Sequence, residues 1–149
     1  MSIVNTVIGD SLSPLVKPPI TQEQLQRYAD AAGDHNPIHL DQEAAHRVGL
    51  QSVIAHGMLS MAFLGQFVTQ QIKDIPGATL AQLKVRFVNM VRIDDTLTCL
   101  GIIKARHGDE SGNEAVEIEC WAQNQKGEKV TLGEAIVAVP LVQKIEVHP

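Results

Sequence analysis

An aspartate and a histidine lie five positions apart in the first third of the chain, at Asp34 and His39. A carboxylate and an imidazole can divide general acid and general base work near neutral pH. On a continuous helix these two side chains would point in different directions, but Pro37 lies between them and forbids a continuous helix. We therefore expect a turn that brings both side chains to one point, where Asn36 can orient one of them.

The same residues also have an ordinary structural interpretation. Gly33 is a natural helix stop, an aspartate after it is a common turn residue, and Asn-Pro is a common turn dipeptide. The residue pattern alone therefore leaves both the catalytic pair and the simple turn open. No pair of histidines in the chain has the spacing of metal ligands, so the sequence predicts no metal site.

A second candidate feature is the dipeptide His56-Gly57, directly before a long apolar segment. The first amides of a helix are free donors at the positive end of its dipole, and Gly57 lets another molecule approach the backbone. Such a position suits a carbonyl oxygen that gains charge in a transition state. Ser60, one turn later, is a small residue that permits close approach. Alternatively, Gly57 only begins a tightly packed helix and His56 caps it.

The elements that must position these residues follow from capping and periodicity. A capping box at Thr21 begins a helix that Gly33 ends. Asp41 can cap a short helix over 42–48. A longer helix is predicted over 57–72, and because its residues are apolar on nearly every side, we expect it to be buried.

The second half of the chain changes to a period of two. Alternation at 82–87 predicts a strand, and three further strands are expected at 95–106, 114–123 and 129–139, with polar loops between them. The first 20 residues contain three prolines and are expected to be irregular. Helices followed by strands indicate an α+β fold, with an antiparallel sheet wrapped around the buried helix.

Composition limits the classes of function. The 149 residues make one domain over 1–149, with 44% hydrophobic and 19% charged residues. A net charge of −5 without a basic stripe argues against nucleic acid as a partner, and no stretch is long enough to span a membrane. Cys99 and Cys120 lie in apolar segments and are interpreted as buried reduced thiols. Without an amino-terminal signal, we expect a cytoplasmic protein.

At these residues the sequence resembles the MaoC-like dehydratases, also called the (R)-specific enoyl-CoA hydratase family. The resemblance rests on Tyr28, on Gly33-Asp34, on the run Asn-Pro-Ile-His at 36–39 and on the run Ala-His-Gly-Met at 55–58. It covers most of residues 20–140. Within the family, the single-domain length and the segment that begins at Gly49 are similar to bacterial (3R)-hydroxyacyl-ACP dehydratase subunits and to short hydratases that feed polyester synthesis.

The resemblance implies a hot-dog fold in which the 57–72 helix lies inside the sheet. It implies that Asp34 and His39 activate water, and that the Gly57 amide holds the thioester oxygen of an acyl-CoA or acyl-carrier-protein substrate. Asn36, His56 and Ser60 are further candidates for orienting or contacting the substrate. No cofactor is implied. The expected assembly is a homodimer, or a heterodimer with a homologous subunit.

Two other functions remain as alternatives. A hot-dog thioesterase would attack the carbonyl carbon, usually with a carboxylate from the central helix, whereas this helix has no Asp or Glu before Asp74. A non-catalytic acyl-binding partner subunit would often lack the Asp–His pair, which is intact here. The sequence does not determine the length of the acyl chain or whether the carrier is CoA or acyl carrier protein.

Overall fold

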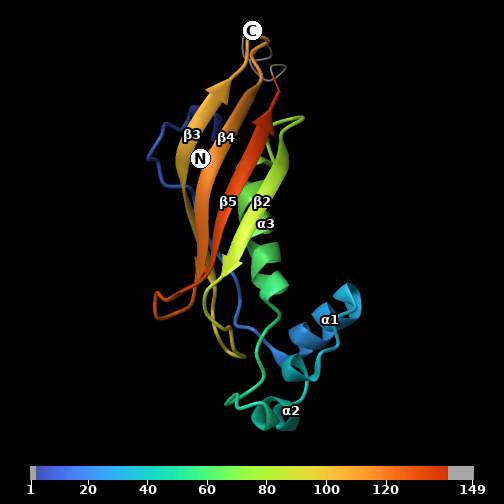
Figure 1. Cartoon of the computed structure of the whole chain (residues 1–149). Helices are drawn as coiled ribbons and strands as arrows, with labels where there is room; N and C mark the ends of the chain where they lie inside the picture. Colours follow the sequence, from blue (N-terminus) through green and yellow to red (C-terminus); the bar gives the residue numbers. More distant parts are fainter. Residues whose placement is uncertain (1–2, 141–149) are drawn as a thin grey trace.

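The computed structural model describes residues 3–140 and consists of a five-stranded antiparallel sheet packed against one long helix (Figure 1). Two shorter helices lie beyond one end of the sheet. The elements in chain order are η1 (Ile3–Asn5), β1 (Leu15–Val16), α1 (Gln22–Ala32), η2 (Pro37–His39), α2 (Gln42–Arg47), α3 (Gly57–Ile72), β2 (Thr79–Phe87), β3 (Thr98–Gly108), β4 (Glu114–Gln123) and β5 (Lys129–Val139).

The strand order in the sheet is β1-β3-β4-β5-β2. Two hairpins join β3, β4 and β5, and their turns contain Gly112 and Gly127 with φ values of 87° and 78°, a conformation that glycine adopts without strain. After α3 the chain enters β2, which pairs with β5 in the order Lys84 opposite Glu134 and Arg86 opposite Leu132. The long strand β2 is therefore an edge of the sheet.

Helix α3 packs against the inner face of this sheet. Leu64, Phe67 and Val68 are fully buried there, and Phe67 lies so close to Gly101 of β3 that a Cβ at Gly101 would come within 2.9 Å of its ring. The prediction that α3 is buried on all sides is wrong. Met58 is 53% exposed, and Ala62 also faces outward, because the sheet curls around one side of the helix only.

The first 20 residues are more ordered than their prolines indicated. Leu15 pairs with Cys99, so the two-residue strand β1 covers part of the edge at β3. Farther along this edge, the Arg106 guanidinium donates to the carbonyl oxygens of Ile3 and Thr6 at 3.1 and 2.7 Å. The amino-terminal segment therefore occupies the edge opposite β2.

The caps predicted for the short helices are present. The Thr21 hydroxyl accepts a hydrogen bond from the Gln24 amide at 3.1 Å, and Gly33 ends α1 with φ 74°. The Asp41 carboxylate accepts from the Glu43 amide and begins α2. These two helices hold residues 34–41 near the amino-terminal end of α3 (Figure 1).

Cys99 and Cys120 are free thiols with buried side chains, as expected. Burial raises the pKa of each thiol to about 12, which keeps both protonated and unreactive near neutral pH.

Among residues 3–140, no helix combines the length and the apolar character needed to cross a lipid bilayer.

Candidate active site

The turn between α1 and α2 is closed by its own side chains. The Asn36 side-chain oxygen accepts a hydrogen bond from the Ile38 amide at 3.2 Å and caps the single 3-10 turn η2. The Asn36 amide in turn donates to the Asp34 carboxylate at 3.2 Å. Pro37 begins η2, where a missing N–H costs nothing. Asn36 therefore orients the Asp34 side chain through the backbone of the turn.

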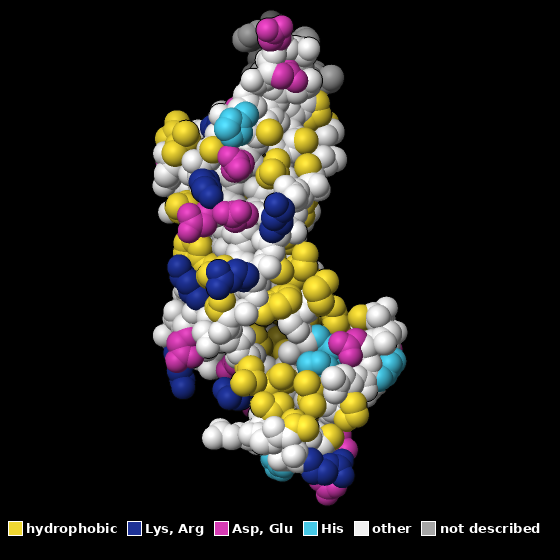
Figure 2. Space-filling view, in the orientation of Figure 1, with side chains coloured by type: hydrophobic (Ala, Val, Ile, Leu, Met, Phe, Trp, Pro, Cys, Tyr) yellow, Lys and Arg dark blue, Asp and Glu magenta, His cyan; other side chains and the backbone are white. Residues whose placement is uncertain are grey.

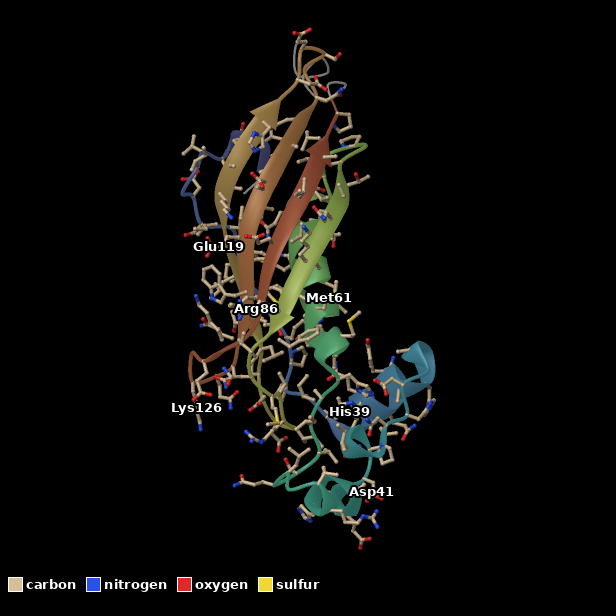
Figure 3. All side chains as sticks on the ribbon, in the orientation of Figure 1. His39, Asp41, Met61, Arg86, Glu119 and Lys126 are labelled. Atoms are coloured by element: carbon tan, nitrogen blue, oxygen red, sulfur yellow. The ribbon has the colours of Figure 1, made fainter. Side chains whose placement is uncertain are left out.

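His39 is held by a backbone carbonyl from a distant part of the chain. Its Nδ1 lies 2.7 Å from the Ile54 carbonyl oxygen, which can only accept, so Nδ1 carries the proton and Nε2 remains available as a base. The His39 side chain is buried, whereas Asp34 is exposed. Figure 3 shows His39 below the first turn of α3, between that helix and the two short helices.

The side chains of Asp34 and His39 lie close enough to hydrogen-bond to the same water molecule. A carboxylate oxygen of Asp34 and a ring nitrogen of His39 lie within 4.8 Å of each other. A water molecule that hydrogen-bonds to two groups can bridge a gap of about 5.5 Å. The predicted convergence of Asp34 and His39 is therefore present, and one water molecule between them can contact both.

His56 links the two members of this pair. Its Nε2 donates a hydrogen bond to the Asp34 carbonyl oxygen at 3.0 Å. Its ring stacks on the His39 ring, with the two centroids 3.9 Å apart and the two planes inclined by 28°. On another side, the centroid of the Tyr28 ring lies 4.7 Å from the centroid of the His56 ring. His56 occupies the N-cap position of α3, as the alternative interpretation expected, but its side chain makes no capping hydrogen bond.

The surroundings of His56 favour its neutral form. Burial lowers the pKa of its imidazole below 6.5, and the nearby His39 adds to this effect, although the hydrogen bond to Asp34 opposes it. The Nδ1 atom is buried and has no hydrogen-bond partner within the described part of the chain. A proton on Nδ1 would therefore add both a buried charge and an unsatisfied donor.

Gly57 begins α3, and among residues 3–140 its amide has no protein acceptor. A Cβ at Gly57 would meet the ring of Phe87, at the end of β2, at 3.3 Å. Packing against Phe87 therefore explains the need for glycine at position 57, and the same residue also offers a free amide donor. The close approach predicted for this position is made here by an aromatic side chain of the protein itself.

Ser60 holds the first turn of α3 in place. Its hydroxyl lies 2.7 Å from the Gly57 carbonyl oxygen and 2.6 Å from the Thr131 hydroxyl of β5. Both hydroxyl side chains are buried. The contacts of Ser60 therefore fix the Gly57 backbone relative to the sheet.

Asp34, His39 and His56 are the only group in the described part of the chain that brings three potential metal ligands together. Imidazole binds a metal in the plane of its ring. Two rings stacked at 28° direct their in-plane lone pairs side by side instead of toward one point. The group is therefore poorly shaped for a metal ion, and the absence of a metal cofactor stays a prediction.

Three contributors to the site were not found from the sequence: the carbonyl of Ile54, the ring of Phe87 and the hydroxyl of Thr131. Every residue has a carbonyl group, so no residue type indicates the role of Ile54. Phe87 fits the alternation of its strand, and nothing in that alternation tells which helix residue it will contact.

Comparison with protein families matches residues 4–124 to the MaoC like domain. The chain is 26% identical over 132 residues to the mitochondrial 3-hydroxyacyl-[acyl-carrier-protein] dehydratase of Arabidopsis thaliana, covering 87% of this chain and 76% of that protein. It is 32% identical over 108 residues to 3-hydroxyacyl-thioester dehydratase Z of Mycobacterium tuberculosis, covering 67% and 71%. Other curated relatives are far longer, and the chain spans 5% and 25% of two of them.

Solved structures share the fold. The (R)-hydratase from A. caviae involved in PHA biosynthesis superposes with a TM-score of 0.79 at 24% identity, covering 91% of this chain and 98% of that chain. A chain of the 3R-hydroxyacyl-ACP dehydratase complex of Mycobacterium tuberculosis superposes with a TM-score of 0.73 at 18% identity, covering 90% and 98%. The expected hot-dog fold, with a curled sheet against a long helix, is therefore confirmed.

The lowered pKa of His56 predicts how stability depends on pH. Below about pH 6.5 the unfolded chain binds a proton at His56 that the folded protein resists, so the free energy of unfolding should fall as the pH falls. His56→Gln removes the titrating ring and keeps a side-chain donor. Urea unfolding midpoints measured between about pH 7.5 and pH 5.5 should fall less for His56→Gln than for the wild type.

His46→Gln, on the exposed surface of α2, removes a histidine outside the site and serves as the control. If His56→Gln and the wild type lose the same amount of stability over this range, His56 is not held in its neutral form.

Proposed function

The chain belongs to the MaoC-like dehydratase family of acyl-thioester hydro-lyases, and we propose that it catalyses the reversible hydration of 2-enoyl thioesters with Asp34 and His39 as its acid–base pair. One observation carries this proposal. The Asp34 carboxylate and a ring nitrogen of His39 lie within 4.8 Å, while the Ile54 carbonyl fixes the tautomer of His39. This spacing and this tautomer support the activation of one water molecule by the pair.

In the hydration direction, water must lose a proton as its oxygen attacks Cβ, and Cα must gain a proton. The Nε2 atom of His39 has a free lone pair that can accept a proton from the water molecule. Asp34 contacts the same water molecule from the opposite side. The two groups can then return a proton to Cα. In the reverse direction, the same pair removes the proton from Cα and protonates the leaving hydroxyl group.

Negative charge collects on the thioester oxygen as Cβ is attacked, because the intermediate resembles an enolate. The Gly57 amide at the start of α3 is a donor without a protein partner in the described residues, and the helix dipole adds positive potential there. Ser60 and Thr131 hold this turn against the sheet. We assign the stabilisation of the developing charge to Gly57.

His56 is assigned a positioning role. It contacts the ring of His39 and the backbone of Asp34, so a displacement of His56 moves both members of the pair. Its neutral form also keeps a positive charge away from the base. Asn36 supports Asp34 from the other side of the turn.

Substitution of either member of the pair tests the catalytic assignment. Asp34→Asn and His39→Gln should each lower kcat by about 10²–10⁴ in protein that stays folded, because Asn keeps the shape of Asp34, Gln keeps a donor for the Ile54 carbonyl, and both remove a proton-transfer group. The double variant should lose little more than either single variant, since residues that act as a unit are non-additive. The assay is the loss of the 2-enoyl thioester absorbance of crotonyl-CoA.

Near-normal turnover by either single variant would contradict the assignment. Asp30→Asn provides a matched control, because it makes the same change on the exposed surface of α1, and it should leave turnover unchanged. Release of free thiol without hydration would indicate a thioesterase instead, and inactivity of the wild-type protein would favour a non-catalytic acyl-binding subunit.

A combination of two substitutions tests the role of Gly57. Gly57→Val keeps the backbone amide but places a branched side chain beside it and against the Phe87 ring. Because the thioester oxygen could no longer reach the amide, kcat/KM should fall by about 10²–10³, the usual effect of a lost oxyanion contact. Phe87→Ala removes the ring that the new side chain meets. In the Gly57→Val, Phe87→Ala double variant, the unfolding midpoint should recover while kcat/KM stays low.

Phe87→Ala alone is the reference for the double variant. If the double variant regains the kcat/KM of this reference together with its midpoint, Gly57 is required only for packing against Phe87.

We also propose that the protein is a dimer, either of this chain or with a homologous subunit. A related dehydratase has been solved as a complex. In this chain β2 is a nine-residue edge strand without a second partner among residues 3–140, and Met58, Phe87 and Met90 expose about half of their surface beside it. Long edges and apolar surfaces of this kind are commonly covered by another chain.

Sedimentation equilibrium at micromolar protein should give twice the mass of the 16.2 kDa chain. Gln82→Pro, in the middle of the edge strand, should shift the equilibrium toward monomer, because proline disturbs an edge that pairs with another strand. An active monomer in the wild-type protein would contradict the proposal.

A further inference from the structure

The segment 53–55 carries the carbonyl group that orients His39, and its three amides are each held by a different part of the chain. The second and third amides donate to the backbone carbonyl oxygens of Ile38 and Val91, at 3.2 and 2.7 Å. Those two acceptors are present whatever the residue type. The first amide, that of Val53, depends on a side chain instead.

Gln42, the first residue of α2, provides the acceptor for that amide. Its side-chain oxygen accepts a hydrogen bond from the Val53 amide at 3.0 Å. Val53 is fully buried, and its amide has no other acceptor among residues 3–140. Loss of the Gln42 oxygen would therefore leave a buried donor without a partner, and the segment would have to move to satisfy it.

His39 and Gln42 contact neighbouring residues of this segment. They lie three positions apart in the chain, and the capped start of α2 at Asp41 fixes one relative to the other. His39 Nδ1 lies 2.7 Å from the Ile54 carbonyl oxygen, and the Gln42 oxygen lies 3.0 Å from the Val53 amide. Because these two groups belong to adjacent residues, a rotation at Val53 would turn the Ile54 carbonyl away from His39.

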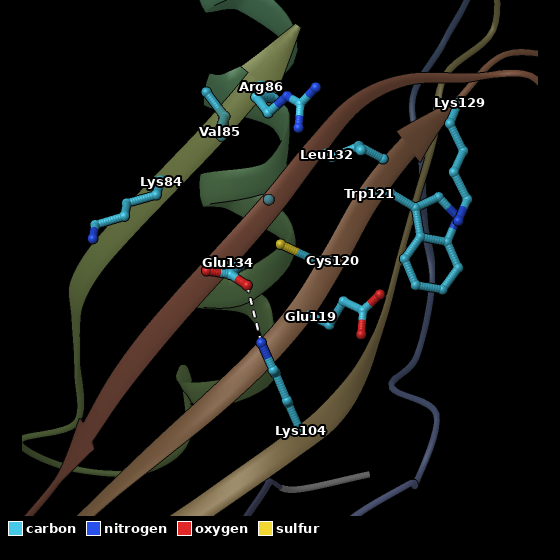
Figure 4. A pocket seen from close by; sticks show the side chains of 11 residues that line it. Lys84, Val85, Arg86, Lys104, Glu119, Cys120, Trp121, Lys129, Leu132 and Glu134 are labelled. Atoms are coloured by element: carbon cyan, nitrogen blue, oxygen red, sulfur yellow. Dashed lines mark hydrogen bonds and ion pairs between the residues drawn. The ribbon is translucent and has the colours of Figure 1, made fainter. Parts of the chain in front are cut away.

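The charged side chains of the sheet do not take part in these contacts. Figure 2 shows Lys and Arg side chains gathered over the middle of the outer face of the sheet. They line a groove of about 520 Å³ around Lys84, Lys104 and Glu134 (Figure 4). That face is turned away from α3, whereas His39 lies beside the first turn of α3 (Figure 3). The orientation of His39 therefore depends on short hydrogen bonds between uncharged groups.

We propose that Gln42 is a positioning residue for the base, and that its bond to the Val53 amide keeps the Ile54 carbonyl aligned with His39 Nδ1. This inference rests on the proposed hydratase function, in which His39 Nε2 accepts a proton from water. Gln42 is assigned no contact with substrate. Its effect on the reaction passes through the orientation of His39, so it belongs to kcat and leaves KM unchanged.

Two substitutions separate the hydrogen bond from the size of the side chain. Gln42→Met keeps a similar length but offers only a weakly accepting sulfur, so it should lower kcat for crotonyl-CoA by about tenfold with KM within about twofold. Gln42→Glu keeps an oxygen that can accept from Val53 and should retain kcat within about threefold. Gln22→Met is the matched control, because Gln22 is the exposed first residue of α1, and it should leave kcat unchanged.

Two further measurements distinguish positioning from a general loss of structure. In the His39→Gln background, Gln42→Met should lower kcat by less than about twofold, because the base through which Gln42 acts is absent. Nitrogen NMR shifts of the neutral His39 ring report which ring atom carries the proton. The wild-type protein should show the Nδ1–H tautomer, and Gln42→Met should show a mixture of the two tautomers.

A wild-type kcat and a wild-type tautomer in Gln42→Met would overturn the proposal. Equal losses in Gln42→Met and Gln42→Glu would also overturn it, as would the same loss with and without His39. If Gln42→Met does not fold, Gln42→Asn gives the same test with a polar side chain that is one methylene group too short for Val53. These outcomes differ from failure of the hydratase function, because the tautomer of His39 is measured without substrate.

Discussion

The hydrogen bond between His39 and the Ile54 carbonyl is the interaction on which the candidate site depends. It fixes the tautomer of the proposed base and ties the catalytic turn to the extended segment that leads into α3. The same segment is held on both sides, since the Ile54 amide donates to Ile38 and the Ala55 amide donates to Val91. Any movement of this segment would therefore change the position of His39, His56 and the first amide of α3 together.

A single buried imidazole, that of His56, contacts both proposed catalytic groups. His56 has no partner for its Nδ1 in the described residues, which is an unfavourable arrangement for a buried polar atom. The stacking on His39 and the hydrogen bond to Asp34 are two contacts that an aliphatic side chain at this position would not make together. The cost in stability is located at the site whose geometry it maintains.

The sheet has separate roles on its two faces and at its two edges. Its inner face packs on α3, and the hydrogen bond between Thr131 and Ser60 fixes the position of Gly57 relative to the sheet. Its outer face collects cations around Trp121. One edge is covered by the amino-terminal segment, whereas the edge at β2 is open in a single chain. Phe87, at the end of β2, lies where the inner face, the open edge and the catalytic turn meet.

Local sequence determined most of the secondary structure and the turn that carries Asp34 and His39. The helix that Gly33 ends, the helix 57–72 and the strands 114–123 and 129–139 were predicted correctly, because caps, glycines and hydrophobic period are local signals. The convergence of Asp34 and His39 was expected because Pro37 excludes the helix that would separate them, although the same residues also fitted a simple turn. Agreement with the MaoC like domain then confirmed the family that these residues indicated.

Tertiary structure decided what depends on contacts between distant segments. The strand Leu15–Val16 exists because β3 offers it an edge, and two residues are too few to show the alternation that predicts a strand. Which side of α3 is exposed depends on how far the sheet curls around it. The spacing of apolar residues along the sequence does not predict that curvature. The proton on His39 and the ring against Gly57 depend on partners 15 and 30 positions away in the chain, and the neutral state of His56 depends on its burial. Hydrogen bonding, burial and van der Waals contact act through space, so the sequence could name the reacting groups but not the surroundings that set their chemistry.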